Sequence, residues 1–351
     1  MKLADRYEGR RAPRRTGLRF GVAAIVSGAV VASVAVALTH SGKGADNLAL
    51  SGDATSGSMQ MSSTVASSYQ VVTLNSNRDL TFNQLLGINN EGVIAGYFGS
   101  GAAGHPNKGY ELSAPFAQGD YRNENFPGSA QTQVTGLNDN GATVGFWANK
   151  SGANFGFYEW HGIFHNVNFP TGTPAKPAVD QLLGVNNSDI AVGFFTNSSG
   201  TNRGYEYNIR TGRFSRVLPP GASNNNLGAS LTAAGINNRG DVTGFYNKTS
   251  SVVDSFLKLH TGQFITLAFP GASATQASGV NDSDEVVGMY TTGSGNSAVT
   301  HGFVWQGGKF STVDIGGGAT ATTVNGVNDE GDLVGFYTDA KGNTDGFLAL
   351  P

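Results

Sequence analysis

The chain of 351 residues has no cysteine, few charged residues and no sustained helical pattern. Without cysteine it forms no disulfide bond, so its fold depends on a buried core. Charged residues make up 13% of the chain and 51 residues are glycine, which a helix interior disfavours by about 1 kcal/mol relative to alanine. After residue 40, apolar residues show no sustained 3.6-residue period. These features predict an all-β protein with many tight turns.

A basic segment followed by an apolar run predicts that the protein is exported. Residues 1–19 carry seven Lys or Arg and two acidic residues, and residues 20–38 carry no charge. This order is typical of an export signal. The apolar run approaches the roughly 20 residues that span a bilayer, while Ala35-Val36-Ala37 offers a small-residue cleavage site. Both a cleaved signal and a retained membrane anchor stay open for residues 1–38.

The rest of the chain divides into a linker and one folded body. Residues 39–67 are rich in Gly, Ser, Ala and Thr, which is typical of a flexible linker. Subtracting residues 1–19 from the totals of 22 basic and 25 acidic residues leaves 15 and 23, a net charge of −8. Because a negative body repels phosphate backbones, we expect no nucleic-acid partner. We expect an extracellular or cell-surface monomer that contacts a membrane only through its N-terminal segment.

Self-comparison of residues 69–351 reveals a motif that occurs six times. Its copies share a glycine, an aliphatic residue, an asparagine and then Asn or Asp, and they begin at Gly87, Gly136, Gly184, Gly235, Gly279 and Gly326. A second glycine always follows nine residues later, at Gly96, Gly145, Gly193, Gly244, Gly288 and Gly335. The period of about 47 residues, with four strand-like segments, is typical of a propeller blade rather than a solenoid coil.

The two ends of the repeat region complement each other. The last repeat stops in its third strand, at residues 346–351, and so lacks a fourth. Before the first repeat, residues 69–74 align position by position with residues 310–315, which belong to a fourth strand. We therefore predict a six-bladed β-propeller over residues 69–351 in which strand 69–75 completes the last blade. Such a closure leaves no open edge of unpaired backbone groups.

Most repeated glycines and aromatic residues are expected to be structural. Phe336, Phe347 and their equivalents should pack between neighbouring blades, where glycine permits close approach of backbones. The loops that follow the second strands begin with an aromatic residue and continue with Asn, Ser, Thr and Gly, a composition that suits sugars as well as plain hairpin loops. On that basis four aromatic residues are candidate ligand-binding residues: Trp147, Tyr246, Tyr290 and Tyr337.

The first strand of each blade is expected to lie nearest the axis of the propeller. Three residues before each leading glycine stands an amide or a hydroxyl: Gln84, Gln133, Gln181, Thr232, Gln276 and Thr323. Such a ring either lines a polar channel mouth or satisfies backbone groups between blades. Asp180 is the single acidic residue at its repeat position, where other repeats have Asn, Thr or Leu. It is therefore a weak candidate for acid–base catalysis as well as for ligand binding.

No metal or cofactor site is predicted. The turns at 282–285 and 329–332 carry carboxylates, but neither has the alternating spacing of a calcium loop, so we interpret them as solvated turns. His161 and His165 are four residues apart, yet a turn and a strand separate them instead of one helical face. Arg239-Gly240-Asp241 lies in a repeat turn that needs its glycine in any case, which argues against an adhesive tripeptide.

The Asn and Gly framework resembles that of the HAF-repeat family of extracellular repeat proteins. The family combines Gly-aliphatic-Asn-Asn-x-Gly-x-aliphatic-aliphatic-Gly with a short His-Ala-Phe-aliphatic-Trp segment. Here His301-Gly302-Phe303-Val304-Trp305 is similar to that segment, with Gly in place of Ala, and the other repeats lack the histidine. The resemblance covers about residues 69–351. It implies export and a repeat architecture, and it supplies no catalytic residues.

Three functions stay open on the sequence. The first is a non-enzymatic binding propeller whose ligand is a glycan, a cell-wall polymer or a protein. The second is a hydrolase or lyase that acts on carbohydrate, for which acidic or histidine residues should converge on the axis. The third is a structural or adhesive surface protein. Since Asp180 alone is acidic near the predicted axis and enzymes usually need two positioned groups, the binding function is favoured over the enzyme.

Overall fold

The computed structural model of the chain describes Arg6 and residues 69–172, 174–220, 222 and 228–351. The predicted export segment at 1–38, apart from Arg6, and the predicted linker at 39–67 lie outside the described residues. Within the described ranges, no helix is long and apolar enough to cross a membrane.

The described chain forms four-stranded antiparallel units, most of which use consecutive strands of one repeat. The first sheet contains β2 (Asn83–Ile88), β3 (Ile94–Phe98), β4 (Lys108–Leu112) and β5 (Tyr121–Asn123). The second contains β6 (Gln131–Leu137), β7 (Thr143–Ala148), β8 (Asn154–Trp160) and β9 (Ile163–Val167). The third contains β10 (Pro174–Val185), β11 (Ile190–Asn197), β12 (Asn202–Asn208) and β13 (Arg213–Arg216). Two short 3₁₀ helices accompany the strands, η2 (Gln118–Asp120) and η3 (Gly295–Ser297).

The fourth and fifth repeats follow the same order. They contain β14 (Leu231–Ile236), β15 (Val242–Asn247), β16 (Val253–Lys258) and β17 (Phe264–Leu267), and then β18 (Ala274–Val280), β19 (Val286–Thr292), β20 (Val299–Gln306) and β21 (Lys309–Val313). A single parallel pair, Val253 with Ala274, joins these two repeats into one eight-stranded sheet. The sequence did not indicate this link.

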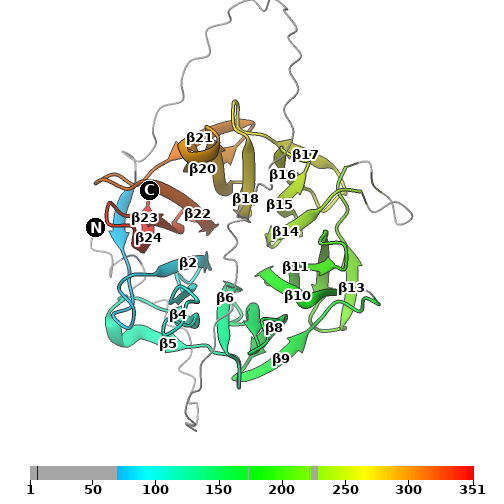
Figure 1. Cartoon of the computed structure of the whole chain (residues 1–351), viewed down its shortest axis with the longest axis horizontal. Helices are drawn as coiled ribbons and strands as arrows, with labels where there is room; N and C mark the ends of the chain where they lie inside the picture. The colour runs from blue at the N-terminus through cyan, green and yellow to red at the C-terminus, as the bar shows by residue number, and fades with distance from the viewer. Residues whose placement is uncertain (1–5, 7–68, 173, 221, 223–227) are drawn as a thin grey trace, which may run out of the picture.

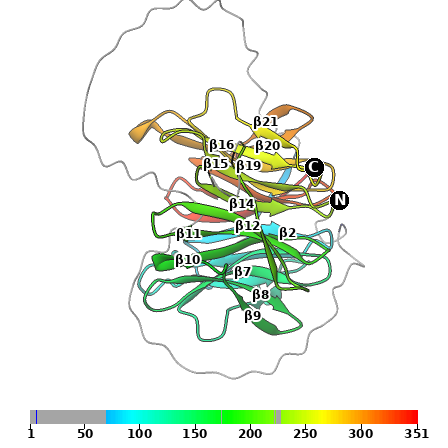
Figure 2. The same ribbon diagram turned by 90° about the vertical axis from the view of Figure 1, so that its right-hand side faces the viewer.

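The sheets are arranged around a common centre (Figure 1). In each of them the first strand lies innermost and the last lies on the perimeter, as β6 and β9 show in the second sheet. Figure 2 shows the body from its side, where neighbouring sheets follow one another around it. Radial repetition of four-stranded sheets is the arrangement of a β-propeller. The prediction of an all-β chain built from four-stranded units is confirmed.

The remaining sheet combines both ends of the described body. Its strands are β22 (Ala321–Val327), β23 (Leu333–Thr338), β24 (Thr344–Leu350) and β1 (Gln70–Thr73). β1 pairs antiparallel with β24, from Gln70 opposite Leu350 to Thr73 opposite Phe347. The strand predicted at 69–75 is therefore observed at 70–73, next to the strand that lacked a partner in its own repeat.

The leading glycines explain how closely neighbouring sheets approach. A Cβ atom on Gly87 would lie 3.1 Å from the Cα of Gly136, and one on Gly136 would lie 3.1 Å from the Cα of Gly184. The same contact recurs at every leading glycine and returns from Gly326 to Gly87, again at 3.1 Å. A side chain at any of these positions would push two sheets apart. The invariant glycine of the motif is thus a packing requirement of the inner strands.

The second glycine of each repeat meets a different constraint. A Cβ atom on Gly193 would lie 2.0 Å from the carbonyl oxygen of Gln181, in the strand paired with it. On Gly335 it would also lie 2.8 Å from the ring of Phe347. Phe347 is fully buried and packs with Val287 and Val313 of the preceding sheet, as predicted. Phe336 does not pack there: it is partly buried and faces the axis.

We expect the substitution Gly193→Ala to destabilise the protein strongly. The new methyl group would overlap the Gln181 carbonyl, and overpacking of this kind costs about 1–3 kcal/mol or more. Gly316→Ala is the matched control, because nothing lies within 4 Å of a Cβ there and no left-handed φ is required. Urea unfolding of both variants measures the difference. Equal stability of the two variants would contradict this role for the second glycine.

Candidate functional site

Two cavities lie along the axis, one near each end of the inner strands. The turn-side cavity has a volume of about 80 Å³ and is lined by the ends of the first strands and the turns after them, for example Ile88, Asn90 and Asp139. The loop-side cavity has a volume of about 40 Å³ and is lined by residues nearer the strand starts, for example Gln84 and Gln276. The two cavities differ in the residues that line them, and this difference indicates which of them is the better candidate for a ligand site.

At the turn side, an asparagine of each motif links its turn to the next repeat. The Asn89 side-chain amide donates to the carbonyl oxygen of Asn138 at 3.1 Å, and the series ends with Asn328 donating to Asn89 at 3.4 Å. The intermediate donors follow the same rule: Asn138, Asn186, Asn237 and Asn281. Their Oδ1 atoms accept backbone N–H groups of their own turns. One side chain therefore shapes a hairpin and joins two repeats.

The next residue of each motif forms a second ring of hydrogen bonds. The backbone N–H of Asn90 donates to Asp139 Oδ1 at 2.8 Å, and that of Asp329 donates to Asn90 Oδ1 at 2.9 Å. The other members are Asp139, Asn187, Asn238 and Asp282, each donating to the next. The prediction of solvated turns agrees with the exposed Asp329 and the partly exposed Asp282, although both carboxylates also accept hydrogen bonds between repeats. It is wrong for Asp332, which is fully buried. Within the described ranges, no cluster of three His, Cys, Asp or Glu could hold a metal ion.

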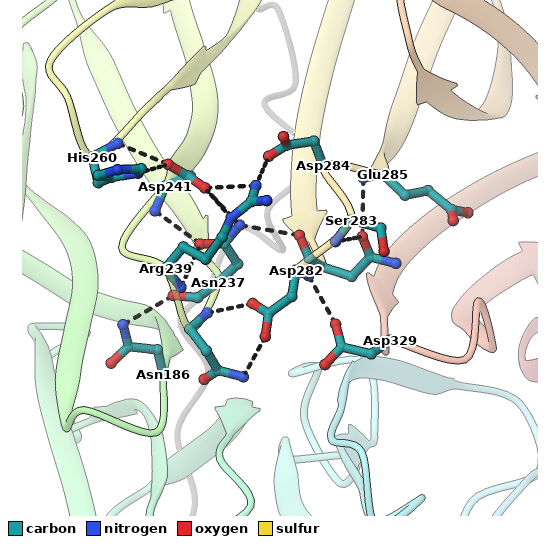
Figure 3. A network of polar contacts seen from close by, with 12 residues as sticks. Asn186, Asn237, Arg239, Asp241, His260, Asp282, Ser283, Asp284, Glu285 and Asp329 are labelled. Carbon is teal, nitrogen blue, oxygen red and sulfur yellow. Dashed lines mark hydrogen bonds and ion pairs between the residues drawn. The ribbon is translucent and has the colours of Figure 1, made fainter.

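An ionic network extends this framework between the fourth and fifth repeats (Figure 3). Asp241 is fully buried and accepts hydrogen bonds from the backbone of His260, at 2.8 Å, and from Arg239, at 2.9 Å. Arg239 also contacts Asp284 across the boundary of the two repeats. Burial acts to raise the pKa of Asp241, but the hydrogen bonds from His260, Asn237 and Arg239 outweigh it and hold the pKa at about 2. The buried carboxylate agrees with the argument against an adhesive role for residues 239–241.

The loop-side cavity has an uncharged lining. Its wall combines aromatic and aliphatic side chains with amides and hydroxyls: Gln84, Leu86, Ala234, Phe245, Gln276, Ala277, Ser278, Met289, Thr323, Asn325 and Phe336. These residues come from the first and second strands of several repeats. Three positions of the predicted polar ring, Gln84, Gln276 and Thr323, do line it. Gln133, Gln181 and Thr232 are not among the lining residues.

The polar ring mostly bonds to side chains of the preceding repeat, whereas the sequence suggested either a channel mouth or contacts with backbone groups. Gln133 donates to Asn107 Oδ1 at 3.0 Å, and Gln181 donates to Asn154 Oδ1 at 3.3 Å. Asn202 donates to Thr232 at 3.2 Å in the same way. Gln84 instead accepts a hydrogen bond from the hydroxyl of Tyr97 at 2.7 Å.

Gln276 is the exception in this ring. The position that holds Asn107, Asn154 and Asn202 in other repeats is Val253 in the repeat before Gln276. A valine offers no hydrogen bond, and Gln276 Oε1 is buried without a partner. Only 9% of the residue is exposed. A buried acceptor left unsatisfied is costly and calls for an explanation.

Asp180, the catalytic candidate, lines neither axial cavity. Its Oδ2 accepts the backbone N–H of Phe169 at 2.6 Å, and its Oδ1 accepts the hydroxyl of Tyr205 at 2.5 Å. Side chains at the same repeat position accept the equivalent backbone N–H elsewhere: Asn83, Thr132, Thr275 and Thr322. Asp180 therefore holds an inter-repeat connection in place. Burial raises its pKa to about 7, although its two hydrogen bonds act to lower it.

The four aromatic ligand candidates make contacts within the fold. Trp147 stacks on Phe126 with ring centroids 4.7 Å apart and donates to Asn166. Tyr290 is buried and stacks on Phe269. Tyr246 packs against a buried cluster, and Tyr337 shares a hydrogen bond with Thr73. Packing within the fold therefore explains why this repeat position is aromatic. A ligand-binding role for these residues stays a prediction.

His301, which carries the family resemblance, bridges two strand ends. Its Nδ1 lies 2.8 Å from Asp314 Oδ2 and its Nε2 lies 3.2 Å from the hydroxyl of Thr292. Its ring also stacks on Tyr290, with centroids 5.0 Å apart. These contacts tie the end of β21 to the hairpin of β19 and β20.

Comparisons with known proteins give only distant likenesses. No protein-family model matches the chain, and no curated protein matches it. Among solved structures, a lectin from Aleuria aurantia has 10% identity and a TM-score of 0.47, covering 76% of this chain and 91% of its own. A gluconolactonase from Xanthomonas campestris has 13% identity and a TM-score of 0.43, covering 82% of this chain and 91% of its own. The β-propeller domain of a Pyrococcus furiosus protease has 8% identity and a TM-score of 0.42, covering 77% of this chain and 94% of its own. At these values, no ligand or activity can be carried over.

The sequence did not indicate a ligand site at several residues that line the loop-side cavity. Phe245, Met289 and Phe336 each follow the second glycine of a repeat, while Ser278 and Asn325 precede the first. Alternation along the first strand offered a signal, because Ser278 lies two residues after Gln276 and so shares its face. The second-strand residues could not be placed without knowing which face of that strand turns inward.

We expect Asp180→Asn to change the pH dependence of stability. The folded carboxyl keeps its proton up to about pH 7, whereas the unfolded one loses it near pH 4. Wild-type stability from this group therefore falls as pH rises between those values. Asn accepts the Phe169 N–H through its Oδ1, can donate its Nδ2–H to the Tyr205 oxygen, and does not titrate. The stability of the variant should therefore rise relative to that of wild type by up to roughly 4 kcal/mol between pH 4 and 8. Urea unfolding at both pH values tests this, and a pH-independent difference would contradict it.

We expect Asn186→Asp to weaken the junction between the third and fourth repeats. The carboxylate keeps the acceptor for its own turn but loses the donor to the Asn237 carbonyl, which costs at least about 2 kcal/mol in a buried site. Asn238→Asp is the control in the second ring, where Asp139, Asp282 and Asp329 already hold the same position. It loses a part-buried hydrogen bond from Nδ2 to Asp282 Oδ2, at 3.1 Å, instead of a buried one. The control should cost less in urea unfolding. The reverse order would argue against the first ring as the stronger junction.

Proposed function

We propose that the described body is a closed six-bladed propeller that binds neutral glycans through its loop-side cavity, without catalysing their cleavage. The proposal includes export to the cell surface or beyond, on the strength of the N-terminal sequence and the resemblance to HAF-repeat proteins. A glycan of the cell surface or cell wall is the ligand class, and the protein acts as a monomer.

Closure is supported by three series of contacts that return to their starting points. The glycine contacts, the asparagine donors and the Asn/Asp ring each run through all six motifs and end on Gly87, Asn89 and Asn90 respectively. The pairing of β1 with β24 supplies the fourth strand of the last sheet. A rigid ring of this kind can hold side chains from separate repeats around one cavity.

The chemistry of the loop-side cavity carries the functional proposal. Its lining combines ring faces and methyl groups with amides and hydroxyls, and among the described lining residues none carries a carboxylate or an imidazole. Such a wall matches a ligand that has both hydroxyl or amide groups and apolar surface, as sugars do. The turn side is less suited, because its polar groups already bond to each other around the ring.

The hydrolase alternative finds less support in this geometry. General acid–base cleavage of a glycosidic bond usually needs two carboxyl groups flanking the bond. Asp180, the one acid expected near the axis, is turned toward Phe169 and Tyr205 instead.

Thermal unfolding of the full chain against a panel of neutral and acidic oligosaccharides tests the proposal. A bound glycan at 100 times its Kd should stabilise the protein by about 2.7 kcal/mol, seen as a saturable rise in Tm. We expect neutral sugars to give the rise and acidic ones to give less. A chelator control separates this from metal binding. No rise with any sugar, or release of cleaved products during incubation, would overturn the proposal.

A further inference from the structure

The unpartnered acceptor of Gln276 specifies the ligand group more closely than the cavity alone. Resting on the proposed glycan-binding function, we infer that the loop-side cavity recognises the acetamido group of an N-acetylated amino sugar. The N–H of that group would donate to Oε1 of Gln276. This residue is nine-tenths buried and lines the cavity, and its Oε1 has no partner.

The repeat pattern shows that one substitution leaves the amide of Gln276 without the partner that it has in other repeats. In three other repeats an Asn of the preceding repeat faces the ring position, as Asn107 does for Gln133 and Asn154 does for Gln181. Val253 stands in that place before Gln276. The repeat therefore retains the glutamine and lacks the partner that elsewhere occupies it. In the repeats of Gln133 and Gln181 the glutamine Nε2 donates to the Asn Oδ1. In this repeat no neighbouring Asn holds the Gln276 amide, and its Oε1 is left to accept from a ligand N–H.

A second polar group is suited to the acetamido carbonyl. The hydroxyl of Thr323 lines the cavity, and its hydrogen-bond partner there is the sulfur of Met289 at 3.6 Å. A thioether sulfur is a weak acceptor, so a carbonyl oxygen would replace it readily. Gln276 and Thr323 thus offer an acceptor and a donor, the two functions that an amide requires of its site.

The size and the apolar wall fit the remaining part of the group. The cavity of about 40 Å³ holds roughly three water-sized groups, since one water needs about 10–15 Å³. An acetamido group has four non-hydrogen atoms, close to this capacity, while a whole sugar ring does not fit. Its methyl group would pack against Met289, Phe245 or Phe336. An uncharged lining disfavours a ligand with a carboxylate or ammonium group, because burying a charge without a partner is costly.

Isothermal titration of the full chain with triacetylchitotriose and with cellotriose tests the inference. The two sugars share their linkage and differ in the acetamido groups. Wild type should bind the acetylated sugar at least tenfold more tightly. Two variants should abolish that preference. Gln276→Met removes the acceptor at similar volume, and Val253→Asn gives the Gln276 amide a partner within the chain, as Asn107 is for Gln133.

Stability of the variants separates a ligand site from a structural role. Replacing an unsatisfied buried amide by an apolar group of similar shape, or satisfying it, should leave Tm unchanged or raise it. Gln133→Met is the matched control: it should lower Tm, because Asn107 loses its partner, and it should keep the preference for the acetylated sugar. A lower Tm for Gln276→Met with the sugar preference intact would overturn the inference.

The outcomes distinguish this inference from the broader proposal. Equal binding of both sugars by wild type would leave glycan binding in place and overturn the acetamido site. If neither sugar binds, N-methylacetamide is titrated while the methyl signal of Met289, one of four methionines in the chain, is followed by NMR. A saturable shift that Gln276→Met removes would retain the acetamido site, with an N-acetylated peptide as its source, and reject the glycan. No shift would overturn both.

Discussion

An asparagine amide that shapes its own turn and also donates to the next repeat is the interaction on which this structure depends. Each of the six asparagines accepts backbone N–H groups of its hairpin through Oδ1 and uses Nδ2 to reach the neighbouring carbonyl, as Asn186 does with Asn237. Aspartate lacks the donor and serine lacks the reach for both contacts. One side chain therefore shapes the local turn and joins it to the next repeat.

The two ends of the axis differ in how completely their polar groups are used. At the turn side the amides and carboxylates of successive repeats bond to each other, and Asp241 adds an ionic contact with Arg239. At the loop side the contacts vary between repeats, because residues such as Val253 depart from the pattern. The regular hydrogen bonds of the turn side stabilise the fold, and the varying contacts of the loop side leave room for ligand recognition. Stability and recognition therefore depend on different ends of the axis.

Much of the fold was predictable from the sequence because the same structurally required residues recur at equivalent positions in six repeats. The offset of nine residues between glycines follows from the pairing of the first and second strands, which brings Gly193 against the Gln181 carbonyl. The four-strand unit and the strand at the N-terminal end followed from alignment of the copies. The single residue pair that joins β16 to β18 could not be predicted, because it depends on how two adjacent sheets pack against each other.

The sequence by itself determined the repeat, its strand order and the ring of amides and hydroxyls at Gln84 and its equivalents. Tertiary structure alone decided what those groups contact. Asp180 was placed near the axis by its repeat position, yet its carboxylate bonds to Phe169 and Tyr205 in the space between sheets. Gln133 and Gln276 are the same residue at the same position, and only the facing side chain distinguishes them. Repeats encode backbone geometry locally, whereas satisfaction of a buried polar atom depends on neighbours that are distant in the chain.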